Sequence, residues 1–519
     1  MMKQCIQRLN NLLNPIMVKE LRQAMRSRFI VILLNLFLGA QFLFVLLYFL
    51  DAQTQIISNG QTLFISLSVL LIGASIACVP AYTVHQLSEE LRNDDMIFST
   101  SMRPFQVVWG KFSSGVVMSA LFFSASAPFL TLTYMMRGLD LQTIFWTIFF
   151  GYISVQVLNG LAILLGTLKL SVIFQSIIAL VFGYFVIVSI DYFSMFSPFS
   201  GSSFYADSWT DAFYVIAITL LISFWVVGTL LFWGAARIAP ETSNRMVGLR
   251  IFQTICFFAV LAIFWGIGLY GWQGGSSSEP LLIIRTGEVI AMIFVAIHAQ
   301  IGICERTRFS RRMIHAIPHS ILKHMAAYPF FTSVYSALTW SFCLFGIFVA
   351  SDFLAWRIME YGHQRLFAEP QIQFWGLVLF FIAYGTAAFI LKEIFNGIRN
   401  LKSRQMSSAN PIQNEDIKIP VKQLGGGQVL GIETILIFLG MALPLLGYYW
   451  LFGLSPDQLD NNSGAFALNI FTYMDEYSNS SRRYDDNTFA PYLLGTLSLC
   501  YWAFVIVRDF LAYMKRYPQ

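Results

Sequence analysis

The stretch from Phe29 to Leu50 reads FIVILLNLFLGAQFLFVLLYFL and contains no charged residue. A helix of about 20 apolar residues, rising about 1.5 Å per residue, crosses the roughly 30 Å hydrocarbon layer of a bilayer. The stretch is therefore predicted to span a membrane. No small-residue cleavage pattern follows it, so we expect it to stay as the first span and not to be removed as a signal peptide.

Eleven further apolar runs follow, which predicts about twelve spans. They cover residues 63–82, 112–135, 144–168, 172–190, 213–235, 251–270, 289–303, 332–350, 374–391, 429–452 and 489–507. The run at 289–303 is short because Arg285 and Glu288 interrupt its outer end, so eleven spans with one re-entrant segment remain an alternative. The sequence thus predicts an all-α integral membrane protein.

The composition of the 519 residues agrees with this class. Hydrophobic residues make up 57% and charged residues 12% of the chain, and the mean hydropathy is +0.64. A water-soluble surface needs far more charge than this. The net charge of +5 is small and spread over short loops, which excludes a nucleic-acid-binding protein. Disordered and disulfide-rich classes are excluded as well.

The loops carry positive charge in strict alternation. With twelve spans and the N-terminus inside, 27 of the 33 Lys and Arg residues fall on the cytoplasmic side and six fall outside. Both termini are therefore predicted to be cytoplasmic, in a multi-pass protein of the cell membrane. The six cysteines lie in spans or on the cytoplasmic side, so no structural disulfide is expected.

Residues 1–28 are predicted to form a cytoplasmic amphipathic elbow before the first span. Asn14 suits the N-cap of a helix and Pro15 its first position. Apolar residues recur with helical spacing from Met17 to Met25, and basic residues lie on the opposite side, where they can meet anionic headgroups. A generic positive flank would explain the charges but not the apolar stripe.

The chain looks like two parallel six-span repeats, at residues 29–239 and 240–519. The second predicted span leads into a charged segment at Leu87–Phe98, and the eighth leads into one at Glu305–Ile314. In each segment an acidic residue opens a predicted short polar helix, and a proline follows 14 residues after Glu90 and 13 residues after Glu305. The second repeat also contains a predicted cytoplasmic insertion at 392–428, a long polar segment.

Three segments carry a resemblance to a known family. The basic elbow from Asn14 to Arg28, the charged segment at Leu87–Phe98, and the entry to the third span from Arg103 to Lys111 resemble the permease subunits of type-2 ATP-binding-cassette (ABC) exporters. The resemblance implies a coupling helix that docks on a separate cytoplasmic ATPase subunit, present in two copies, which holds ATP and Mg²⁺. It also implies re-entrant outer helices at Asp191–Asp211 and a path lined by spans two, five, eight and eleven.

The segment from Cys304 to Pro318 is similar to what such permeases carry in their later half. The resemblance therefore assigns coupling to the ATPase to charged residues of the two matched segments. These are Glu89, Glu90, Arg92, Asp94, Asp95, Glu305, Arg306, Arg311 and Arg312. The alternative interpretation is a solvated loop with the usual positive bias. One chain with both halves could form the whole transmembrane unit, and a dimer with a second permease chain is the alternative. The substrate is not indicated.

No motif predicts catalysis, a bound cofactor or a metal site in this chain. Gly110-Lys111 lacks the earlier glycine and the following Ser or Thr of a phosphate-binding loop. The Gly425–Gly427 run resembles an ABC ATPase signature, but no cytoplasmic segment is long enough for a nucleotide-binding domain. Three histidines after the eighth span are interrupted by Pro318, which favours interfacial residues over metal ligands.

Two other functions are compatible with many spans. An ion-coupled secondary transporter needs ionisable residues at membrane depth, and the sequence offers mainly Glu433 and His298. Both are more simply explained as structural residues, so scarcity of buried charge argues against this alternative. A membrane scaffold that recruits an ATPase without transporting anything is the third possibility.

Overall fold

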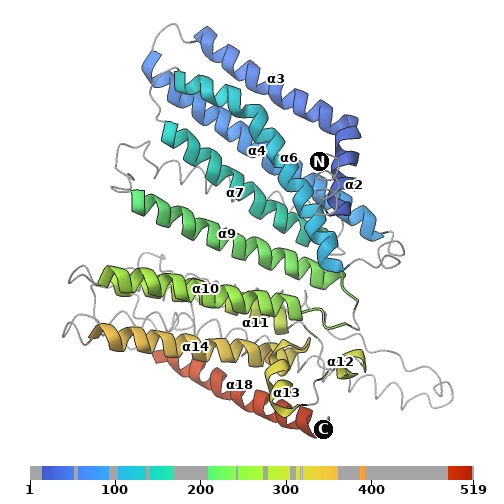
Figure 1. The fold of residues 1–519 in the computed structure, drawn as a ribbon, viewed down its shortest axis with the longest axis vertical. Helices are drawn as coiled ribbons and strands as arrows, with labels where there is room; N and C mark the ends of the chain where they lie inside the picture. Colours follow the sequence, from blue (N-terminus) through green and yellow to red (C-terminus); the bar gives the residue numbers. More distant parts are fainter. Residues whose placement is uncertain are drawn as a thin grey trace, which may run out of the picture. The chain divides into compact units, whose positions relative to one another are not determined.

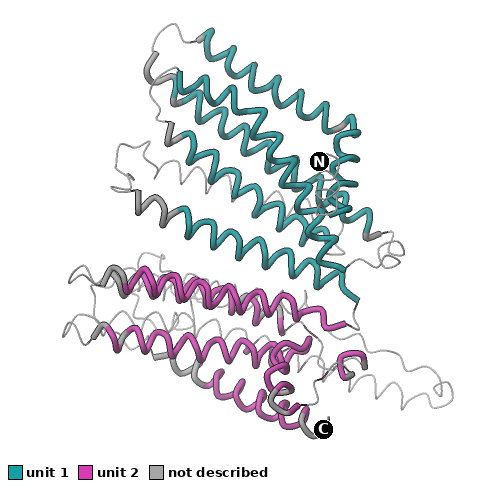
Figure 2. Tube along the Cα trace, in the orientation of Figure 1, with its two compact units in different colours: residues 1–241 teal, residues 242–519 magenta. Residues whose placement is uncertain are grey.

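The computed structural model describes most of the helical regions of the chain. The described residues are 14–51, 56–92, 103–135, 141–167, 209–240, 243–272, 279–303, 305, 311–315, 317, 320–360, 386–387, 389–391, 394 and 489–516. Every regular element among them is a helix (Figure 1). The chain divides into two compact units, residues 1–241 and 242–519 (Figure 2), which are described separately.

Unit 1 is a bundle of long helices with one short helix before it. Its elements are α2 (Pro15–Arg26), α3 (Arg28–Asp51), α4 (Ile56–Arg92), α6 (Pro104–Met135), α7 (Leu141–Gly166) and α9 (Trp209–Ile238). Helices α4, α6 and α7 pack against one another, α9 packs on α6 and α7, and α3 lies on α4 and α6. Asn14 caps α2 and Pro15 is its first residue, as the sequence predicts.

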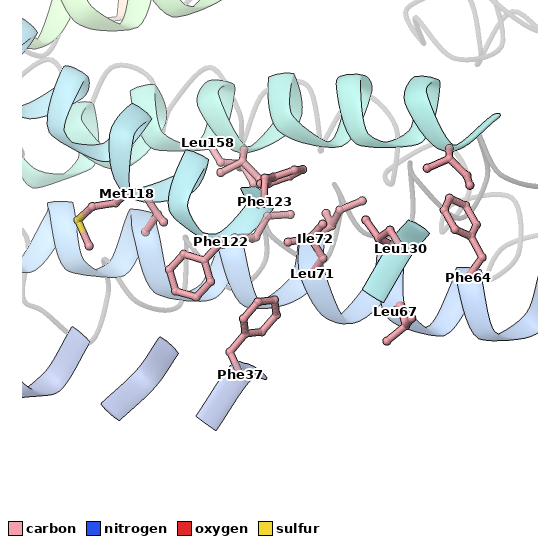
Figure 3. Packing of buried hydrophobic residues seen from close by; sticks show 14 of the residues in the cluster. Phe37, Phe64, Leu67, Leu71, Ile72, Met118, Phe122, Phe123, Leu130 and Leu158 are labelled. Carbon is pink, nitrogen blue, oxygen red and sulfur yellow. The ribbon is translucent and has the colours of Figure 1, made fainter. Parts of the chain in front are cut away.

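The apolar core of unit 1 lies between α3, α4, α6 and α7 (Figure 3). Phe122 of α6 meets Phe37 of α3 edge-on, with ring centroids 5.3 Å apart. Leu67 and Leu71 of α4 are almost wholly buried in the same core. In a membrane such close packing, rather than exclusion of water, is what holds helices together.

Unit 2 is built on α10 (Val247–Trp272), α11 (Glu279–Ile303) and α14 (Val334–Glu360). Helix α11 packs on both α10 and α14, and α18 (Phe489–Arg516) packs on α14. Between α11 and α14 lie the short helices α12 (Arg311–His315) and α13 (Ile321–Ala327) and the 3₁₀ turn η2 (Tyr328–Phe330). The turn packs under α14, and the Tyr328 hydroxyl lies 2.9 Å from Asp509 of α18.

Seven helices of the described residues are long and apolar enough to cross a membrane. They are Ile30–Leu50, Thr62–Glu90, Pro104–Met135, Ile144–Gly166, Ile216–Ile238, Val247–Leu269 and Val334–Ala355. The chain is therefore an all-α, multi-pass membrane protein. The predicted runs at 289–303 and 489–507 lie in α11 and α18, helices of 25 and 28 residues.

Several predicted features lie outside the described residues. They are the runs at 172–190 and 429–452, most of the run at 374–391, the outer segment Asp191–Asp211 up to the start of α9, and the insertion at 392–428. Twelve spans and two parallel repeats therefore stay predictions.

Each charged segment was predicted to open with a separate short polar helix, and the structure differs from this at the described residues. Residues Leu87–Arg92 continue α4, because nothing in this stretch of good helix formers interrupts the helix. Glu305 lies in a bend just after α11, residues 306–310 lie outside the described residues, and the next described helix begins at Arg311.

Candidate functional site

In unit 1, three segments meet at a buried lysine. The Nζ of Lys111 on α6 lies 2.9 Å from Oε1 of Glu20 on α2 and 2.9 Å from Oε2 of Glu90 on α4. The side chains of Lys111 and Glu20 are only 2% and 1% exposed. The second oxygen of Glu90 accepts a hydrogen bond from Lys19 at 3.0 Å. These four residues form the Lys111 cluster.

The charges of the Lys111 cluster balance, with two lysines facing two glutamates. The exposed Lys19 side chain and the half-buried Glu90 form the outer edge of the cluster. The hydrogen bond to Glu90 raises the pKa of Lys19, so this lysine stays charged. Lys111 ties α2 to α6 and α4 from inside, where breaking a pair leaves an uncompensated charge.

Helix α2 reaches this position because its first turn fits closely on α6. Asn14 accepts the backbone N–H of Ile16 at 3.0 Å, which caps the helix, and donates to the carbonyl of Gln106 at 2.6 Å. A Cβ on Gly110 would lie 2.8 Å from Cβ of Ile16. Only glycine lets α2 lie this close, next to Lys111.

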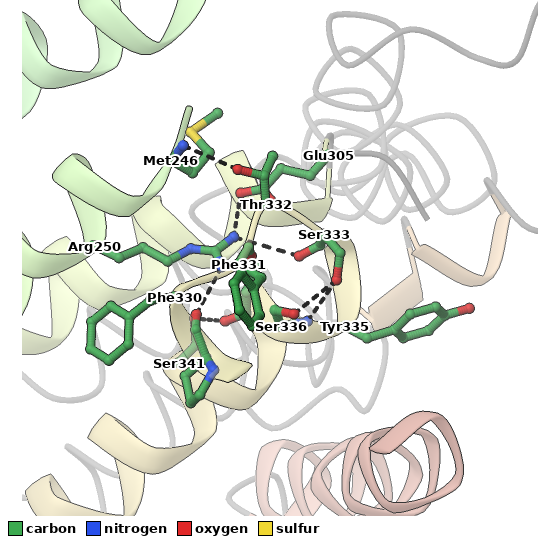
Figure 4. A network of polar contacts seen from close by, with 12 residues as sticks. Met246, Arg250, Glu305, Phe330, Phe331, Thr332, Ser333, Tyr335, Ser336 and Ser341 are labelled. Atoms are coloured by element: carbon green, nitrogen blue, oxygen red, sulfur yellow. Dashed lines mark hydrogen bonds and ion pairs between the residues drawn. The ribbon is translucent and has the colours of Figure 1, made fainter. Parts of the chain in front are cut away.

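Unit 2 has a buried arginine in a comparable place (Figure 4). Arg250, in the first turn of α10, is fully buried and pairs with the carboxylate of Glu305 after α11. Its guanidinium also donates to the carbonyls of Pro329, at 2.8 Å, and of Phe331. These acceptors belong to the segment that leads into α14. A guanidinium supplies the several donors in fixed directions that this arrangement needs.

Asn244 fixes the same segment from its other side. Its Oδ1 accepts the backbone N–H of Thr332 at 2.9 Å, and its Nδ2 donates to the carbonyl of Phe330 at 3.2 Å. Thr332 in turn accepts the N–H of Met246 at 3.1 Å. Asn244, Arg250 and Glu305, with the backbone of residues 329–333, form the Arg250 cluster.

The two clusters join equivalent parts of their units. Each has an asparagine in the segment before the first long helix, Asn14 or Asn244, that bonds to the backbone at the start of the third. Each has a glutamate at the end of the second long helix, Glu90 or Glu305, paired with a buried cation. The cation comes from the third helix in unit 1 and from the first in unit 2.

The residues predicted to couple to an ATPase fall into four groups. Glu90 and Glu305 take part in the internal clusters just described. Glu89 is exposed and lies 3.6 Å from His85, and Arg312 on α12 is exposed too. Arg92 ends α4 and Arg311 begins α12, and nothing is described of their side chains; Asp94, Asp95 and Arg306 lie outside the described residues. The docking role of all nine stays a prediction.

Buried charge is more abundant than the sequence indicated. Beyond the two clusters, Glu288 of α11 and Asp352 of α14 are 0% and 4% exposed. Expected scarcity of buried ionisable groups was therefore wrong for unit 2. The predicted span begins at residue 289, just after Glu288, whereas α11 begins nine residues before Glu288, at Glu279. Continuing the helical spacing of apolar residues to positions before 289 would have placed Glu288 inside the helix.

Of the two ionisable residues that the sequence singled out, His298 is buried in α11 and its ring lies 4.4 Å from that of Trp340. Glu433 lies outside the described residues. Among the residues described, no group of three His, Cys, Asp or Glu side chains could hold a metal ion.

Comparison with known proteins yields no match: no protein-family model, no curated protein and no solved structure is similar to this chain.

Proposed function

We propose that the chain is the membrane-spanning permease subunit of an ABC exporter, driven by ATP hydrolysis on a separate ATPase subunit. The multi-pass helical architecture is compatible with this role. In this proposal the chain is not an enzyme, both termini are cytoplasmic, and the charged ends of α4 and α12 face the ATPase.

The observation that carries the proposal is the pair of buried clusters at the starts of the charged segments. A permease must pass movement from a docked ATPase into its membrane helices. Lys111 joins the end of α4 to α2 and α6, so a force on the charged end of α4 acts on three elements together. Arg250 joins the residue after α11 to α10 and the entry of α14 in the same way. Buried, paired charges make such joints stiff because separating them is costly.

The test is purification of the full-length protein from its own membranes under mild extraction, with measurement of co-purifying ATPase activity and identification of the subunit that carries it. Charge reversal at the exposed residues Glu89→Arg and Arg312→Glu should reduce both recovery and activity, because rim charges set orientation and association. These residues are preferred to Glu90 and Glu305, whose reversal would break a buried cluster.

The matched control is Arg357→Glu, a charge reversal at an exposed arginine. Arg357 lies in the last turn of α14, at the end predicted to be on the outer side of the membrane. It should leave recovery of the ATPase unchanged. If no ATPase with a phosphate-binding loop co-purifies with the wild type, and the reversals at Glu89 and Arg312 change nothing, the proposal is wrong.

Buried charge in unit 2 favours a second candidate, an ion-coupled secondary transporter. Glu288, Asp352 and Arg285 lie together in membrane-length helices, where ionisable residues commonly serve ion or proton pathways. Transport by purified protein in vesicles, driven by an ion gradient without ATP, would support this candidate over the first.

A further inference from the structure

Helices α10, α11 and α14 enclose a cluster of polar side chains in unit 2. The proposed permease function assigns no role to this cluster. Glu288 Oε1 lies 2.6 Å from Ser351 Oγ, which lies 2.8 Å from Trp265 Nε1. Nε of Arg285 lies 3.5 Å from Asp352 Oδ1. We call these five residues the Glu288 cluster. Trp265 lies 15 residues after Arg250 along α10, so the two clusters are about 22 Å apart along the helix.

Two hydrogen bonds connect Trp265, Ser351 and Glu288. An indole N–H can only donate, so Ser351 accepts from Trp265. The Ser351 hydroxyl donates to Glu288 Oε1. With Oε1 accepting this hydrogen bond, Oε2 is the oxygen left to carry a proton.

Oε2 of Glu288 is buried and has no hydrogen-bond partner among the described residues. A charged oxygen in this position is unfavourable, because burial removes it from bulk solvent and no described donor compensates the charge. Protonation at Oε2 removes that charge. Oε2 is also the oxygen that does not accept the hydrogen bond from Ser351.

The charges that face Glu288 leave it partly uncompensated. Arg285 lies one turn before it on α11, and Asp352 lies on α14 next to Ser351. One guanidinium therefore faces two carboxylates. Helix α10 contributes the Trp265 N–H, and its one charged residue, Arg250, lies near its other end.

We propose that Glu288 is a proton-binding site, which takes up a proton at Oε2 and releases it to water. The step converts a carboxylate and a proton into a carboxylic acid, and no other bond forms or breaks. Arg285 and Asp352 remain paired in both states. Their side chains are 12% and 6% exposed.

Infrared difference spectroscopy tests the proposal on the full-length protein in lipid vesicles, between alkaline and acidic pH. Uptake at Glu288 should produce the carbonyl stretching band of a protonated carboxyl group in apolar surroundings. The band should vanish in Glu288→Gln, which keeps the shape and the acceptor for Ser351. It should persist in Glu89→Gln, the same change at an exposed glutamate.

Two further variants decide the matter if Glu288→Gln does not fold. Asp352→Asn should move the midpoint of the band to lower pH, by about one unit, because a like charge is removed. Ser351→Ala should move it to higher pH, because the carboxylate loses a donor. These opposite shifts would support the proposal, and unchanged midpoints in both variants would overturn it.

A band that persists in Glu288→Gln, or no band in the wild type, would overturn the proposal. None of these readouts involves an ATPase, so failure of this proposal and failure of the proposed function can be distinguished.

Discussion

The Nζ of Lys111 lies 2.9 Å from Oε1 of Glu20, a residue 91 positions earlier, and both side chains are almost wholly buried. Replacing Lys111 by Met leaves Glu20 as a buried charge without the cation that pairs with it. We expect a loss of about 3–5 kcal/mol in the free energy of unfolding, measured by denaturant titration in detergent micelles.

The control for this change is Lys19→Met, which removes the exposed lysine of the same cluster. Its effect should stay within about 1 kcal/mol. The double variant Glu20→Gln/Lys111→Met should recover most of the loss, because the unpaired charge disappears. A double variant no more stable than Lys111→Met would show that the ion pair is not the cause.

The cap of α2 offers a second prediction. Asn14→Ala removes both the acceptor for Ile16 N–H and the donor to the Gln106 carbonyl. We expect α2 to leave α6 more often, at a cost of about 1 kcal/mol or more. Trypsin cleavage after the exposed residues Arg22 and Arg26 should then be faster.

Asn14→Ser separates the two contributions, since serine keeps the cap but does not reach Gln106. Cleavage at an intermediate rate is expected. Wild-type rates in both variants would mean that Asn14 does not hold α2 in place.

The contact between α6 and α7 depends on a glycine. A Cβ on Gly115 would collide with the amide of Asn159, which donates to the Phe112 carbonyl at 3.3 Å. Gly115→Ala should therefore lower the thermal unfolding midpoint, by an amount equivalent to about 1–3 kcal/mol. Gly73→Ala is the matched control in α4, because a Cβ there meets nothing within 4 Å. It should be neutral or stabilising by up to about 1 kcal/mol.

Arg250→Lys tests whether the several N–H donors of the Arg250 guanidinium stabilise unit 2. A lysine keeps the charge opposite Glu305 but cannot bond to the Pro329 and Phe331 carbonyls at once. We expect a loss of about 1–3 kcal/mol, read from denaturant unfolding of unit 2 helices. Arg312→Lys, at an exposed site, should change stability by less than about 0.5 kcal/mol. Equal losses of stability in the two variants would show that the hydrogen bonds from the Arg250 guanidinium to the two carbonyls are not important.

Local signals in the sequence predicted much of the helical architecture. Asn14 and Pro15 define the start of α2 because capping depends on neighbouring residues alone. The long apolar runs of unit 1 are membrane-length helices, since a bilayer imposes a minimum length that composition reveals.

The buried polar sites could not be predicted in the same way. Glu20 looks like a polar residue of an amphipathic helix, and only its fit against Lys111, far along the chain, explains its burial. Glu305 looks like the start of a charged surface helix, yet its partner Arg250 lies 55 residues earlier. Ion pairs between distant segments leave no periodic signal, so these contacts required the folded arrangement.

The balance of charge in the Lys111 cluster has a consequence for the response of unit 1 to voltage. A membrane potential does about 2.3 kcal/mol of work on each elementary charge per 100 mV. Lys19, Glu20, Glu90 and Lys111 carry two charges of each sign, so the field does no net work when they move as a unit. Movement of this joint between α2, α4 and α6 should proceed equally well in polarised and depolarised membranes.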